Sequence, residues 1–86
     1  MNIEELIANV KKKLKKNINI ETILIEDKTF LHENHSGHEN NKFHLKITIG
    51  SVELKKLNKI EGNKKIYKIL DKELKNQIHS LQILIN

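Results

Sequence analysis

IYKILDKELKNQIHSLQILI, residues 66–85, carries two hydrophobic periodicities in succession. The first has the spacing of one helix face and comprises Ile66, Tyr67, Leu70 and Leu74. The second alternates as in a half-buried strand over 78–85, where one parity comprises His79, Leu81, Ile83 and Ile85. A helix that leads into a C-terminal strand is therefore expected, with a short extra turn before the strand.

A second strand is expected upstream, over 43–49, because apolar residues alternate there with His44, Lys46 and Thr48. The alternation predicts that His44 faces solvent. Residues 52–61 fit either a helical turn or an irregular crossover. Glycine inside a continuous helix costs about 1 kcal/mol relative to alanine, so we expect Gly62 to mark the start or a joint of a helix that begins near Asn63.

The N-terminal half predicts a helix over 3–16, followed by a strand over 18–27 and a polar loop over 28–41. Asn2 and Glu5 have the spacing of a capping box. The apolar stripe of this helix comprises Ile3, Leu6, Ile7, Val10 and Leu14. The predicted order is thus helix, strand, strand, helix, strand.

Length and composition restrict the class of protein. A chain of 86 residues has room for one core, so we expect one domain over 1–86. The absence of cysteine excludes disulfides, a cysteine nucleophile and a self-contained thiolate metal site. No apolar run approaches the roughly 20 residues that span a bilayer, and the acidic N-terminus is unlike a signal peptide. We therefore expect a cytoplasmic protein with no membrane partner.

The net charge of +5 would suit a polyanion or an acidic protein partner, although solvated lysine-rich helix faces are the favoured explanation of such charge runs. The sequence has no nucleophile elbow, no phosphate-binding glycine loop and no paired-carboxylate constellation. We therefore expect a binding protein and not an enzyme.

Four segments resemble the BolA family. Residues 43–47 (FHLKI) resemble its second strand, and 66–74 (IYKILDKEL) resembles its helix pattern I-Y-x-x-L-x-x-E-L. Residues 78–81 (IHSL) resemble the family hallmark at the last strand, and 32–38 (HENHSGH) resembles a histidine- and glycine-bearing loop. The resemblance covers essentially the whole chain. It implies an α+β fold of order αββαβ, related to one class of KH domain, with a three-stranded sheet and helices packed on one face.

The chain also departs from the family pattern. Members usually carry an Arg-His-Arg triplet before the Ile-Tyr pair, where this chain has Gly62-Asn63-Lys64. Lys56 stands where a turn glycine is usual, and a tail that ends in tryptophan is missing after Asn86. A function that depended on the arginine charges is therefore in doubt, because lysine lacks the planar donor fork of arginine.

The resemblance implies a role in iron–sulfur cluster assembly or redox regulation. Family members form heterodimers with monothiol glutaredoxins that share a 2Fe–2S cluster, to which glutaredoxin and glutathione supply thiolates. His79 matches the last-strand ligand, and His32 is the best loop candidate, with His35 and His38 as rivals. No cofactor is expected on the chain alone, which would be a monomer or a weak homodimer. Without the resemblance, His79 is more typical of a half-buried structural histidine, and the loop histidines of ordinary polar residues.

The alternative function is nucleic-acid binding by a transcription regulator. It follows from the basic charge and the KH-related fold, and its candidate residues are Asn63, Lys64 and Lys65. KH domains clamp a strand with a G-x-x-G loop, whereas residues 62–65 read GNKK and lack the second glycine. Stacking aromatic side chains are also scarce.

Overall fold

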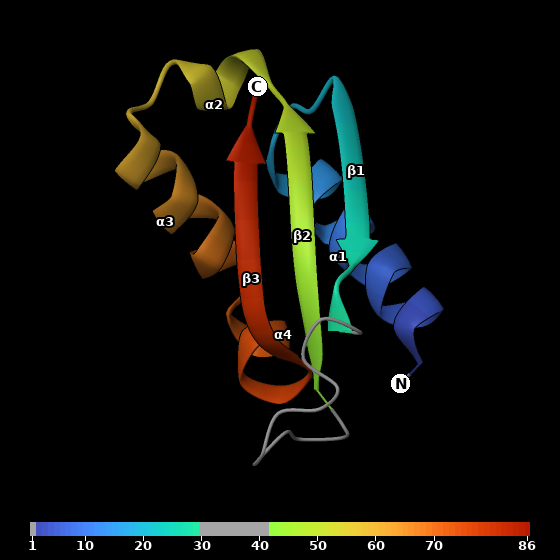
Figure 1. The fold of residues 1–86 in the computed structure, drawn as a ribbon. Coiled ribbons are helices and arrows are strands. Elements are labelled where there is room, and N and C mark those ends of the chain that lie inside the picture. Colours follow the sequence, from blue (N-terminus) through green and yellow to red (C-terminus); the bar gives the residue numbers. More distant parts are fainter. Residues whose placement is uncertain (1, 30–41) are drawn as a thin grey trace.

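A three-stranded sheet with helices on one face forms the structure, a computed structural model that describes residues 2–29 and 42–86 (Figure 1). The strand order is β1-β2-β3, with β1 antiparallel and β3 parallel to the central β2. Along the chain the elements are α1 (Ile3–Asn17), β1 (Thr22–Asp27), β2 (Phe43–Gly50), α2 (Val52–Lys55), α3 (Lys59–Ile69), α4 (Asp71–Asn76) and β3 (Ile78–Ile85). The expected αββαβ order is confirmed, because α2, α3 and α4 together form the crossover that parallel strands require.

The core is built from aliphatic side chains between the sheet and the helices. The strands bury Ile25, Leu45, Ile47, Ile49 and Ile78, the helices bury Leu6, Val10, Leu14, Leu54 and Ile66, and Leu70 is buried at the junction of α3 and α4. Each fully buried side chain of this kind stabilises the fold by about 1.5–3 kcal/mol. The prediction that the odd-numbered residues of 43–49 face the core is therefore correct.

The longest described helix, α1, begins at a capping box. The Asn2 side-chain oxygen accepts a hydrogen bond from the Glu5 backbone N–H at 2.8 Å, and the Asn2 amide donates to the Glu5 carboxylate at 3.0 Å. This confirms the predicted cap. With its 15 residues α1 is too short to cross a bilayer, and no other helix within 2–29 and 42–86 is long and apolar enough to do so.

Two predicted boundaries are wrong. Helix α3 begins at Lys59, capped by Asn58, and Gly62 lies inside it, not at its start. A Cβ atom on Gly62 would lie 3.0 Å from Ile85 Cδ1, so glycine lets α3 approach β3 closely. Strand β1 begins at Thr22 and not at residue 18, because Ile18 terminates α1 and is buried in the core.

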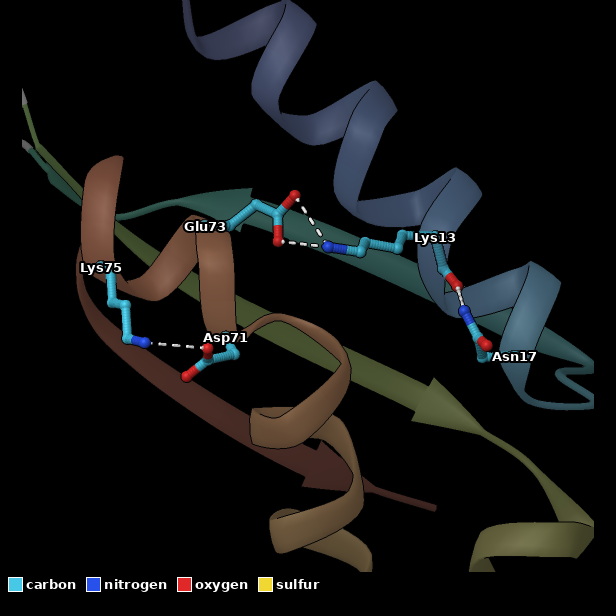
Figure 2. A network of polar contacts seen from close by, with 5 residues as sticks. All are labelled: Lys13, Asn17, Asp71, Glu73 and Lys75. Carbon is cyan, nitrogen blue, oxygen red and sulfur yellow. Dashed lines mark hydrogen bonds and ion pairs between the residues drawn. The ribbon is translucent and has the colours of Figure 1, made fainter.

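An ion pair joins α1 to α4 across the helical layer (Figure 2). Lys13 Nζ lies 2.9 and 3.3 Å from the two carboxylate oxygens of Glu73. Glu73 is only 4% exposed, which makes it one of the few buried polar residues among those described. Since α4 leads directly into β3, this pair helps to fix the start of the last strand.

Candidate metal-ligand site

A β-bulge at the start of β3 determines where His79 lies. Phe43 pairs with Ile78, but the next residue of β2, His44, pairs with Ser80, so His79 is the extra residue of β3. A bulge shifts the parity of a strand by one residue. Ile78 and the odd-numbered residues from Leu81 onward can therefore all face the core.

His79 is exposed as a consequence of this bulge. The alternation predicts that His79 faces the same side of the sheet as Leu81. This is wrong, because the bulge at His79 lies between the two pairing registers. The backbone just before the bulge is held by two hydrogen bonds. Phe43 N–H donates to the Gln77 carbonyl at 2.8 Å, and Gln77 N–H donates to the Glu73 carbonyl at 2.8 Å. The end of α4 is thereby tied to the start of β2.

His44 lies beside His79, and its predicted exposure to solvent is wrong. It occupies the parity opposite to Leu45, as the alternation predicts, yet only 6% of it is exposed. Its Nδ1 lies 2.6 Å from Ser80 Oγ. Alternation predicts the side of the sheet but not which neighbouring side chains cover a residue, and here the bulge brings Ser80 and His79 next to the ring.

The two imidazole rings contact each other. Their centroids are 4.9 Å apart and their planes are tilted by 56°. Neutral imidazole is a good ligand for iron, zinc and copper. Within residues 2–29 and 42–86 no group of three or more histidine, cysteine, aspartate or glutamate side chains is arranged to hold a metal ion. The described residues thus offer two nitrogen ligands and no thiolate, which suits a metal centre completed by another molecule.

The remaining predicted ligands, His32, His35 and His38, lie outside the described residues. The sequence patterns assign no site role to His44 or Ser80. A signal for them was present: Ile78 and Leu81 are both apolar but differ in parity, and only a bulge between them allows both to face one core.

The residues predicted for nucleic-acid binding lie on a second surface. A groove of about 310 Å³ between the α2–α3 turn and β3 is lined by Lys55, Lys59 and Asn63, among others. The Asn63 side-chain oxygen is buried there with no hydrogen-bond partner among the described residues. Lys64 is exposed, whereas Lys65 Nζ lies 2.7 Å from the Glu53 carboxylate.

Glu53 connects several segments near this groove. Its carboxylate accepts hydrogen bonds from Lys65 and from the Asn19 backbone N–H. The hydrogen bond from Lys65 is the main cause that lowers the pKa of Glu53 below its ordinary value of 4.5, and the bond from Asn19 adds to it. Glu53 therefore already neutralises part of the positive charge expected to attract a polyanion.

Comparison with known proteins identifies relatives over most of the chain. The BolA-like protein family matches residues 14–86. The DNA-binding transcriptional regulator BolA of Haemophilus influenzae is 30% identical over 83 residues, which cover 96% of this chain and 75% of that relative.

Solved structures show the same arrangement of helices and strands. The BolA domain of SufE1 from Arabidopsis thaliana superimposes with a TM-score of 0.78 at 25% identity and covers 92% of this chain and 87% of its own. BolA1 from Arabidopsis thaliana has a TM-score of 0.76 at 24% identity, with the same coverage of both chains, and supports the fold alone. The expected α+β fold is confirmed.

Proposed function

This chain belongs to the BolA-like protein family, and we propose that it is a non-enzymatic partner of a monothiol glutaredoxin that contributes His79 to a shared 2Fe–2S cluster. The observation that carries the proposal is the exposure of His79 at the bulge of β3. An imidazole at this place is accessible to a second protein. The role is in cluster assembly, cluster transfer or redox regulation.

The ligand chemistry of the chain suits a shared cluster. The chain has no cysteine, so the thiolates come from glutaredoxin and glutathione. Replacement of thiolate by histidine raises the reduction potential of a 2Fe–2S cluster. The chain itself orients His79 through the bulge and presents it at the sheet end that α4 and the start of β2 hold together. For a second imidazole, the family resemblance offers His32, His35 and His38.

Reconstitution with a monothiol glutaredoxin tests this proposal. The purified chain is mixed with glutaredoxin, iron, sulfide and glutathione, and the visible absorption and circular dichroism are recorded. We expect a heterodimer whose spectrum differs from that of the glutaredoxin homodimer, and His79→Ala should abolish the difference. Gln82→Ala is the matched control, because Gln82 is exposed on the same strand. A wild-type mixture with the spectrum of the glutaredoxin homodimer would contradict the proposal.

Nucleic-acid binding is the second candidate function, favoured by the similarity to the DNA-binding transcriptional regulator of Haemophilus influenzae and by Lys55 and Lys59 at the groove next to Asn63. It predicts a salt-dependent shift of labelled DNA that Lys64→Glu combined with Lys65→Glu abolishes. Lys11→Glu with Lys12→Glu on α1 changes the net charge equally and is the control. Equal loss of binding in both double variants would indicate attraction by charge alone and contradict a specific site at Lys64 and Lys65.

A further inference from the structure

We propose that His44 and His79 together form a two-imidazole half-site for a transition metal ion, with His44 as the second nitrogen ligand. Its biological occupant, an iron atom of the shared cluster, rests on the proposed function, but the pair itself can be tested with a metal ion alone. The proposal differs from the family resemblance, which places the second imidazole within residues 32–38.

The ring separation fits two ligands of one ion. A zinc–imidazole bond is about 2.0–2.1 Å long, and the ring centre lies about 1.2 Å further out, so two rings at a near-tetrahedral angle have centres about 5 Å apart. The centroids of His44 and His79 are 4.9 Å apart. The separation of the ring centres is therefore compatible with two ligands of one ion.

The contact with Ser80 holds the ring of His44 and occupies its Nδ1 atom. Histidine ligands almost always donate their other ring N–H to a hydrogen-bond acceptor, which fixes the tautomer and the ring orientation. The Nδ1 atom of His44 lies 2.6 Å from Ser80 Oγ. When Nδ1 donates to this hydroxyl, the lone pair of the neutral ring is on Nε2, which is then the ligand atom.

The backbone of His44 is fixed by the end of β1. Its N–H donates to Thr29 Oγ1 at 3.1 Å, and its carbonyl accepts a hydrogen bond from the Lys28 N–H at 2.7 Å. A ligand that is already held by hydrogen bonds loses little freedom on binding. His44 is thus the rigid member of the pair, and exposed His79 leaves the outer side open for the ligands of another molecule.

The two variants that test the pair are His44→Gln and His79→Ala. Zn²⁺ alone is titrated into the full chain at neutral pH by calorimetry. We expect one ion per chain and a loss of affinity of at least about tenfold in each variant, with a loss of about 10–100-fold in Ser80→Ala. The chain with His32→Ala, His35→Ala and His38→Ala together should bind as the wild type does. Wild-type affinity in His44→Gln, loss in the triple variant alone, or no binding by the wild type would each overturn the inference.

A measurement on the unmutated chain guards against misfolding of His44→Gln. In a ¹⁵N-labelled sample, Zn²⁺ should shift the Nε2 resonance of His44 together with a ring nitrogen of His79. A response of His79 alone would refute the pair. If His44 fails these tests while the glutaredoxin spectrum still depends on His79, only this inference falls. If Zn²⁺ binds the pair but the glutaredoxin spectrum is independent of His79, only the proposed function falls.

Discussion

The ion pair between Lys13 and Glu73 predicts a large destabilisation when only its cation is removed. The Glu73 side chain is 5% exposed and that of Lys13 is 36% exposed. Removing one partner of a fully buried pair costs about 3–5 kcal/mol, because the other charge stays buried without compensation. Since water reaches the ammonium group, we discount this value and expect Lys13→Met to lower the free energy of unfolding by about 2 kcal/mol.

Thermal and urea unfolding followed by circular dichroism measure this effect. For a domain of this size, 2 kcal/mol corresponds to a fall in Tm of about 8–16 °C. Glu73→Gln should cost less, about 1 kcal/mol, because it leaves no charge in the interior. The double variant Lys13→Met with Glu73→Gln should therefore be more stable than Lys13→Met alone.

The pair between Asp71 and Lys75 provides a control on the same helix (Figure 2). Its atoms are 3.1 Å apart, but both side chains are about two-thirds exposed or more, at 66% and 72%. Lys75→Met should change the free energy of unfolding by less than about 0.5 kcal/mol. If Lys13→Met cost no more than Lys75→Met, the reasoning from burial would be refuted.

Two further predictions concern Glu53 and Gly62. Lys65 lowers the pKa of Glu53 below 4.5, so the ionised Glu53 carboxylate stabilises the fold above that pH. Glu53→Gln should therefore have a lower Tm than the wild type by a constant amount above pH 4.5. This difference in Tm should disappear as the pH falls through the lowered pKa. A deficit that persists at lower pH would contradict this assignment. Gly62→Ala should leave Tm nearly unchanged, because two effects offset each other. Alanine favours a helix by about 1 kcal/mol over glycine, whereas its Cβ atom requires Ile85 Cδ1 to move slightly. Gly62→Leu should destabilise by about 1–3 kcal/mol in urea unfolding, and wild-type stability of this variant would show that α3 and β3 are not closely packed there.

Local patterns predicted the element order and several details correctly. The cap formed by Asn2 and Glu5 depends on residues three positions apart, and the inward parity of 43–49 depends on strand geometry alone. Such features need no knowledge of distant contacts. This is why the sequence alone indicates an αββαβ chain.

The errors arose where distant segments decide the outcome. Gly62 is disfavoured in a helix by its own propensity, yet it lies within α3 because β3 approaches at that point. The exposure of His44 and the parity of His79 are predicted wrongly because a bulge sets the pairing of two strands that are far apart in sequence. Propensity describes a single residue, whereas burial is decided by register and packing.

Pulsed electron paramagnetic resonance of the reduced heterodimer tests the central claim most directly. The cluster is assembled with ¹⁵N-labelled chain and unlabelled glutaredoxin and glutathione, so that a ¹⁵N coupling to the cluster identifies a nitrogen ligand from this chain. We predict a strong ¹⁵N coupling in the wild type that is lost in His79→Ala and retained in Gln82→Ala. A cluster with no ¹⁵N coupling, or with the same coupling in His79→Ala, would contradict the claim that exposed His79 binds iron.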